Sequence, residues 1–209
     1  MALRDRSLRK MKYLLAALLA LSLSALAGPG GAPDIVEAAK KQIGLTVVYD
    51  PSYEVIAFPG GDVPRQRGVC TDVVVRALRD ARRYDLQLEI NKDMRNHRSA
   101  YPKKWGLSSS KADSNIDHRR VPNIMSFLDR KGFSMPISAD VSKYLPGDVV
   151  TWSLGGGLHH IGIVSDRKTV FGKPLVIHNI GQGTLEENIL TEYRILGHYR
   201  IPASLGQRG

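Results

Sequence analysis

The chain contains one cysteine, Cys70, in the run GVCTD at positions 68–72. Two histidines follow in strand-like segments: His160 opens the run HIGIV, and His178 ends the run VIH. A thiolate can attack a carbonyl carbon, and an imidazole can take the thiol proton and return it to a leaving group. The three residues therefore form a candidate site for nucleophilic catalysis.

Other interpretations of these residues stay open. Because exported cysteines normally pair as disulfides, a lone cysteine is a dimer-forming thiol, a buried structural thiol or a reactive one. The two histidines favour a reactive Cys70, although a histidine in a strand is often structural. The adjacent His159 should point to the opposite face of its strand and be exposed. The sequence has no C-x-x-C run and no histidine pair four residues apart, so we expect no metal and no cofactor.

The segment from Cys70 to Arg83 has the spacing of an amphipathic helix. Its apolar residues fall along one side: Val73, Val74, Ala77, Leu78 and Ala81. Cys70 would then lie at the helix start, where free backbone N–H groups and the helix dipole favour a thiolate. The N–H of Cys70 itself could stabilise a developing oxyanion.

From Gly147 onward the pattern changes to strands separated by Gly-rich or polar turns. The expected strands cover residues 149–152, 160–165, 175–180 and 195–201. Gly162 has no side chain on the face that carries His160, which leaves room beside the imidazole. His178, near the end of an adjacent strand, can orient the His160 ring through its far nitrogen.

Helices precede these strands along the chain. Asp34 can cap a helix that runs to about Gln42, and Pro122 begins another that ends before Gly132. A short strand is expected at 45–49, followed by a Pro- and Gly-rich loop. Helices followed by an antiparallel meander predict an α+β fold, formed by a single domain over residues 28–209.

The first 27 residues predict a cleaved signal peptide. Five basic residues precede an apolar run at 13–23, and Ala25-Leu26-Ala27 has the small-x-small pattern of a cleavage site. The apolar run of about eleven residues is shorter than the roughly 20 that span a bilayer, so we expect no retained membrane anchor. Cleavage after Ala27 predicts a periplasmic or secreted protein, whether translation starts at Met1 or at Met11.

The formal net charge of +10 falls to about +6 when residues 1–27 are removed. This charge suits an anionic partner such as a cell-wall polymer or a membrane surface, although a generic basic surface is the alternative. No arginine-rich arm or basic-aromatic pattern points to nucleic acid. We expect a monomer.

The chain resembles, from about Ile35 to Ile201, a bacterial envelope family catalogued as domain of unknown function 1287. The matching runs are FPGGDVP (58–64), GVCTDVV (68–74), NIDHRRVP (115–122), GDVVTW (147–152), HIGIVSD (160–166), HNIG (178–181) and GHYR (197–200). The order of a helix-start cysteine, an H-x-G-I-V strand and a V-I-H strand is also similar to the NlpC-type papain-fold hydrolases. The run PGDVV at 146–150, which leads into the strand before His160, also fits this group.

The NlpC-type resemblance implies a papain-like α+β fold and a cysteine hydrolase that acts on peptide or amide bonds, typically in peptidoglycan. It places the nucleophile at Cys70, the base at His160 and a polar third residue at His178. By analogy with a tyrosine found upstream of the cysteine in such proteins, Tyr53 is a candidate oxyanion or substrate contact, with a packed loop aromatic as the alternative. Asp72 and Asn179 complete the candidate substrate-binding residues.

The chain departs from the NlpC-type pattern in two ways. Those proteins usually have Asp-Cys-Ser-Gly, whereas here a carboxylate, Asp72, lies close to the sulfur and would raise the thiol pKa. The 90-residue separation of Cys70 and His160 implies an insertion of helices and loops at about 86–145, which shapes a different groove. Within it, the cluster DHRR at 117–120 could bind a substrate carboxylate or anchor the helix that follows. A non-catalytic wall-binding module and a thiol acyltransferase remain the alternative functions.

Overall fold

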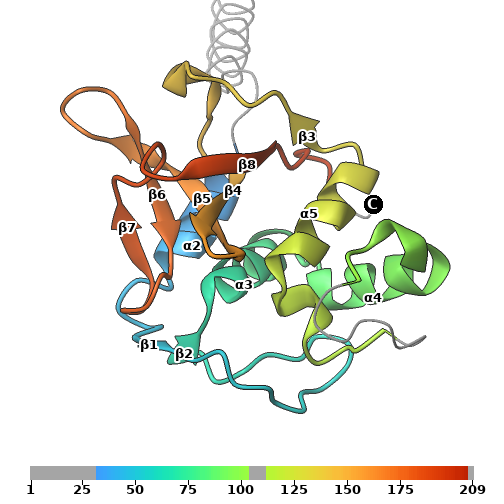
Figure 1. Cartoon of the computed structure of the whole chain (residues 1–209). Helices are drawn as coiled ribbons and strands as arrows, with labels where there is room; N and C mark the ends of the chain where they lie inside the picture. The colour runs from blue at the N-terminus through green and yellow to red at the C-terminus, as the bar shows by residue number, and fades with distance from the viewer. Residues whose placement is uncertain (1–31, 104–111, 207–209) are drawn as a thin grey trace, which may run out of the picture. The chain divides into compact units, whose positions relative to one another are not determined.

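The computed structural model describes residues 32–103 and 112–206 (Figure 1). The predicted signal peptide and its cleavage site lie outside these ranges. The described chain is a mixed α+β structure, as predicted. Its α-helices are α2 (Pro33–Lys40), α3 (Cys70–Arg82), α4 (Leu86–Asn96) and α5 (Val121–Arg130), and its short 3-10 helices are η2 (Arg98–Ala100), η3 (Asp117–Arg119) and η4 (Val141–Lys143).

The main sheet is antiparallel and has the strand order β3-β8-β4-β5-β6-β7. Its strands are β3 (Ser134–Met135), β4 (Val149–Gly155), β5 (Leu158–Lys168), β6 (Pro174–His178), β7 (Leu185–Glu187) and β8 (Arg194–Tyr199). Strands β4, β5 and β6 are consecutive neighbours, but β8 returns to the far side of β4, so the sheet is not a simple meander. A separate parallel pair joins β1 (Val48–Tyr49) to β2 (Arg67–Gly68).

The sheet separates two groups of buried side chains, because successive residues of a strand point to opposite faces. On one face α2, α3 and α5 pack against Ile161 and Ile163 of β5 in the main core. On the other face Trp152 and Val176 join Leu190 in a smaller cluster. This alternation decides which histidines face the cysteine-bearing helix α3, shown in teal in Figure 1.

The segment 86–145, predicted to be an insertion, contributes to the same core as α3. Helix α4 buries Leu86, Ile90 and Met94, and their spacing of four residues places them on one face. At its far end the segment forms β3, which pairs with β8 at the edge of the main sheet. These elements therefore complete the domain that holds the site.

The predicted element boundaries need two corrections. The first helix begins at Pro33, with Asp34 in its first turn instead of at the cap, and the Asp34 carboxylate pairs with Arg82 of α3 at 2.8 Å. Helix α4 lies in the expected helical and loop insertion, but its bounds were not predicted, although Asp85 caps it by accepting the N–H of Gln87 at 3.1 Å. Within the described ranges no helix is long and apolar enough to cross a membrane.

Candidate functional site

Cys70 is the first residue of α3, as the sequence predicted, and its side chain is buried. The helix start is held by the carboxylate of Asp72, whose Oδ2 accepts the N–H of Val69 at 2.7 Å. Gly68 has to be a glycine here, since a Cβ at this position would lie 2.9 Å from that same oxygen. The run GVCTD therefore forms a tight turn that places the Cys70 thiol at the N-terminus of α3.

His160 and His178 form a buried pair on neighbouring strands β5 and β6. Nε2 of His160 lies 2.9 Å from Nδ1 of His178, and the ring planes are nearly perpendicular. Gly162 makes room for this pair, because a Cβ there would meet Val176 Cγ1 at 2.7 Å and His178 Cβ at 3.1 Å. The expected space beside His160 is therefore occupied by the second histidine and its strand.

Glu187 of β7 supplies a carboxylate on the far side of this pair. Its Oε2 lies 3.1 Å from Nε2 of His178, at ion-pair distance but without the alignment of a hydrogen bond. A carboxylate there favours the proton on Nε2, so that Nδ1 of His178 accepts from Nε2–H of His160. Nδ1 of His160 is then the nitrogen left with a free lone pair, which is what a general base needs.

The thiol approaches β5 at Ile161, the residue after His160. The strand pairing with β6 begins only at Ile163, so the backbone N–H of Ile161 is left for the sulfur, and it favours the thiolate. No hydrogen bond joins Cys70 to either ring of the histidine pair within the described chain. His160 shares the sheet face of Trp152, whereas α3 packs on the opposite face. The thiol therefore lies on the face of the sheet opposite to the histidine pair, and it contacts β5 at the backbone N–H of Ile161.

Burial keeps the Cys70 thiol and the His160 and His178 imidazoles neutral. It raises the pKa of the Cys70 thiol to about 12, and the charge of Asp72 acts in the same direction. Burial also lowers the pKa of His160 to about 3, with His178 contributing. The pKa of His178 is lowered by burial as well, against the opposing effect of Glu187. A neutral thiol therefore lies near neutral imidazoles.

Asp72 does not present a free carboxylate to a substrate. Nε and Nη2 of Arg119 donate to its two oxygens, each at 3.0 Å, and both side chains are almost fully buried. Arg119 also donates to the carbonyls of Ser52, through Nη1 at 3.0 Å, and of Asp50, through Nη2 at 3.1 Å. The pair thus ties η3 and the loop after β1 to the helix start.

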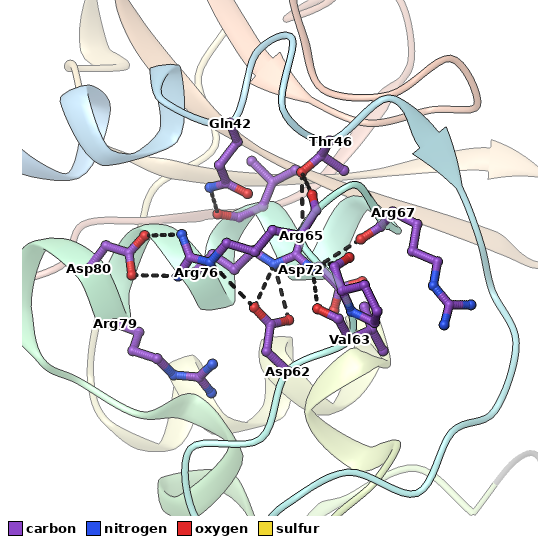
Figure 2. Close-up of polar contacts among 12 residues, drawn as sticks. Gln42, Thr46, Asp62, Val63, Arg65, Arg67, Asp72, Arg76, Arg79 and Asp80 are labelled. Carbon is purple, nitrogen blue, oxygen red and sulfur yellow. Dashed lines mark hydrogen bonds and ion pairs between the residues drawn. The ribbon is translucent and has the colours of Figure 1, made fainter.

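A second arginine fixes the chain that enters β2. The buried side chain of Arg76 binds the carboxylate of Asp62 through Nε at 2.9 and 3.0 Å (Figure 2). Its Nη2 donates to the carbonyls of Val63 at 3.1 Å and Arg67 at 3.0 Å, and Nη1 donates to Thr46 Oγ1 at 3.1 Å. These contacts hold the loop before Cys70 against α3.

A pocket of about 520 Å³ opens at the thiol. It is lined by Tyr49, Pro51, Val69, Cys70, Ile116, Arg119, Arg120, Val121, Pro122, Gly157, Leu158 and His159. This volume is within the range of small-ligand sites. The expectation of an exposed His159 is corrected: the residue is half-buried and lines the pocket together with Cys70.

The tyrosine beside the thiol is Tyr49. The parallel pairing of β1 with β2 places it opposite Gly68, and burial together with the charge of Cys70 raises the pKa of its hydroxyl. Tyr53, the residue expected there, is exposed, and its hydroxyl binds Asp113 at 3.2 Å and Asn115 at 2.8 Å. The pairing of β1 with β2 leaves no local signal in the sequence from which Tyr49 could have been found.

Asn179 connects the end of β6 to the chain before the cysteine. Its Nδ2 donates to the carbonyl of Gly68 at 3.0 Å, and its Oδ1 accepts the N–H of Gly181 at 3.2 Å. The side chain is fully buried and serves to position Cys70 relative to His178. Within the described residues, no group of three or more His, Cys, Asp or Glu side chains is arranged to hold a metal ion.

The fold and site together describe an α+β domain with a helix-start thiol, a pocket lined by that thiol and His159, and a buried histidine pair on β5 and β6. The chain belongs to the family described as Domain of unknown function (DUF1287), whose model matches residues 36–201. It is 51% identical over 166 residues to the uncharacterized protein YijF of Escherichia coli (strain K12), covering 79% of this chain and 80% of that protein. The family expected from the sequence runs is confirmed.

Proposed function

We propose that this protein is a cysteine hydrolase of the NlpC-like, papain-fold class, an amidase or endopeptidase that cleaves peptide or amide bonds in peptidoglycan. We place it in the periplasm or outside the cell, as a monomer that requires no cofactor. The observation that carries the proposal is the position of Cys70: a helix-start thiol on a pocket, held at the edge of the strand that carries His160. The cysteine and the two histidines, their order along the chain and the pocket at the thiol are all suited to transfer of an acyl group to the Cys70 sulfur.

The proposed reaction begins with substrate in the pocket and its carbonyl carbon against Sγ of Cys70. As Sγ attacks, Nδ1 of His160 takes the thiol proton, and the resulting imidazolium is stabilised through His178 and Glu187. The backbone N–H of Cys70 is a donor for the oxyanion. The imidazolium then gives its proton to the leaving amine. His160 next takes a proton from water as that water attacks the thioester carbon, and it returns the proton to the Cys70 sulfur when the C–S bond breaks.

Because both groups are neutral in the resting site, the proton has to move as the sulfur attacks and cannot be transferred in advance. Because His160 lies on the sheet face opposite to α3 in the resting site, its ring must also move before Nδ1 comes within hydrogen-bond distance of Sγ, a rearrangement that the mechanism assigns to the substrate complex. Tyr49 lines the pocket beside Cys70 and is a candidate contact for the bound acyl group.

The test is incubation of the purified protein with isolated peptidoglycan, followed by mass spectrometry of the released fragments. We expect wild-type protein to release fragments and Cys70→Ala to release none, with the exposed-residue variant His97→Gln as a control that retains release. Equal release by Cys70→Ala would overturn the proposal. Reaction in ¹⁸O-labelled water separates hydrolysis, which labels the new carboxyl group, from acyl transfer to another nucleophile, which does not.

A non-catalytic wall-binding module is the second candidate, and the protonated, buried thiol without a histidine hydrogen bond favours it. This candidate predicts saturable binding to wall material that Cys70→Ala leaves intact, with no new fragments. Iodoacetamide labelling of Cys70 with and without wall fragments distinguishes the two candidates. A hydrolase predicts that occupancy of the pocket changes the pH profile of labelling, whereas a binding module predicts simple protection.

A further inference from the structure

Two neighbouring arginines line the pocket at the thiol, and the structure gives them different roles. The donors of Arg119 are committed to Asp72 and to two backbone carbonyls. The side chain of Arg120 makes a single hydrogen bond in the described chain, from Nη1 to Oδ1 of Asp117 at 3.1 Å. Its side chain remains 23% exposed, whereas that of Asp117 is only 2% exposed. Arg120 is therefore the arginine that a ligand can reach.

The counter-ion of Arg120 is itself fully engaged. Oδ2 of Asp117 accepts the N–H of Asp113 at 2.6 Å, and its backbone carbonyl accepts Nδ2 of Asn123 at 3.0 Å. Asp117 thus steadies one edge of the guanidinium. The other edge, Nε and Nη2, contacts no acceptor in the described residues and is not sealed from solvent. Such an edge fits the two oxygens of a carboxylate.

The position of Arg120 relative to the thiol is also fixed. The hydroxyl of Thr71 donates to the carbonyl of Arg119 at 3.1 Å, which joins the residue after Cys70 to the residue before Arg120. The described pocket lining contains no Asp or Glu side chain, so two cationic residues face the cavity without an acidic one. Apolar walls at Pro122 and Leu158 complete the surface.

We propose that Arg120 forms a carboxylate-binding subsite beside Cys70, and that the pocket selects peptides with a free carboxylate near the bond that reacts. The selection of peptides rests on the proposed function, whereas the binding of a carboxylate by Arg120 does not. The proposal gives the two arginines of the DHRR cluster (117–120) different roles. Arg119 positions the start of α3, and Arg120 binds the carboxylate of the ligand.

The first experiment measures alkylation of Cys70 by iodoacetate and by its neutral isostere iodoacetamide at one ionic strength. Because both reagents react with the same thiol, differences in its intrinsic reactivity cancel in the ratio of the two alkylation rates. We expect Arg120→Gln to lower the iodoacetate-to-iodoacetamide ratio by about tenfold, the worth of a charge-assisted hydrogen bond. Arg120→Lys should restore part of the ratio, and Arg130→Gln, at the far end of the helix α5 that follows Arg120, should leave it unchanged. An unchanged ratio in a folded Arg120→Gln protein would overturn the subsite.

The second experiment does not depend on a reactive thiol. Binding of N-acetyl-alanyl-glutamate and N-acetyl-alanyl-glutamine, both as C-terminal amides so that only the glutamate probe carries a carboxylate, is measured on Cys70→Ala protein by NMR titration. The subsite predicts about tenfold tighter binding of the glutamate probe, and loss of that preference in the Cys70→Ala, Arg120→Gln double variant. Equal binding of both probes contradicts the subsite. A carboxylate preference in a protein that releases no wall fragments would retain the subsite while rejecting the hydrolase.

Discussion

Nε2 of His160 lies 2.9 Å from Nδ1 of His178, so the two rings share one proton across strands β5 and β6. With Glu187 beyond them, the pair forms a short line of polar groups that ends at Nδ1 of His160. Cys70 contacts β5 at the backbone N–H of Ile161, on the opposite face of the sheet. The pocket, however, is lined by the neighbouring His159. Which of the two adjacent histidines serves the thiol is therefore the first question for experiment.

We predict that His160 is the base and His159 is not, because the His160 ring is oriented by its hydrogen bond to His178 at 2.9 Å, whereas the His159 ring has no hydrogen bond within the described chain. His160→Gln should lower kcat for fragment release by roughly 10²–10⁴-fold, the range expected for loss of general acid–base catalysis. His159→Gln should change mainly KM, through its position on the pocket wall. The measurement is steady-state release kinetics with both variants. The reverse pattern would assign the base to His159.

Glu187 is predicted to act as a positioning residue through the His178 tautomer and charge. Glu187→Ala should place some of the His178 proton on Nδ1, which ¹⁵N NMR of the ring nitrogens detects without any activity assay. Glu187→Gln retains an acceptor oxygen and should largely restore the wild-type tautomer. Since the carboxylate raises the pKa of His178, both variants should also shift the acid limb of the pH–rate profile to lower pH.

The exposed Glu192 provides the matched control for this pair of variants, because its carboxylate lies 3.7 Å from Lys173 and away from the histidines. Glu192→Gln should leave the ring-nitrogen shifts and the acid limb unchanged. If Glu187→Ala has no effect on either readout, the carboxylate does not set the tautomer.

Breaking the buried Asp72–Arg119 ion pair is predicted to lower the stability of the protein and to raise the reactivity of the Cys70 thiol. Asp72→Asn leaves Arg119 buried without its charged partner and should cost about 3–5 kcal/mol in the free energy of unfolding. The same change removes the negative charge that helps to raise the pKa of Cys70, so alkylation at a fixed pH should become faster. Urea unfolding and iodoacetamide kinetics provide the two measurements. Slower alkylation of the folded variant would contradict this account.

The helix and the strands that hold the site could be predicted because their signals are local. The apolar spacing after Cys70 gave α3 to within one residue, and the runs around His160 and His178 lie in β5 and β6. The residues that complete the site come from tertiary pairing instead. Tyr49 is brought in by the two-residue strands β1 and β2, and Arg119 meets Asp72 across 47 residues of chain. Neither contact leaves a periodic pattern in the sequence.

The side of the sheet on which each histidine lies was predicted only in part. Alternation along a strand correctly separates His159 from His160, but it does not say which face α3 covers. The structure places α3 on the face of Ile161 and Ile163, which turns His159 toward the pocket. The helix packing therefore reverses the expected exposure of His159.

Stability is predicted to fall in mild acid, because His160 and His118 are buried in the neutral form. Burial lowers their pKa values from 6.5 to about 3 and about 4, respectively. Below pH 6.5 the unfolded chain therefore binds protons that the folded chain does not, so unfolding becomes more favourable as pH falls toward these values. Between pH 6.5 and pH 5 each histidine should cost up to about 2 kcal/mol of the free energy of unfolding.

Urea unfolding at pH 7 and pH 5 measures this loss, and single variants divide it between the two histidines. His118→Gln and His160→Gln should each reduce the difference between the two pH values, whatever they do to stability at pH 7. His97→Gln, at an exposed position, should leave the difference unchanged. If neither buried-histidine variant reduces the difference, the acid sensitivity arises elsewhere, and the neutral thiol–imidazole state from which the proposed mechanism starts loses its support.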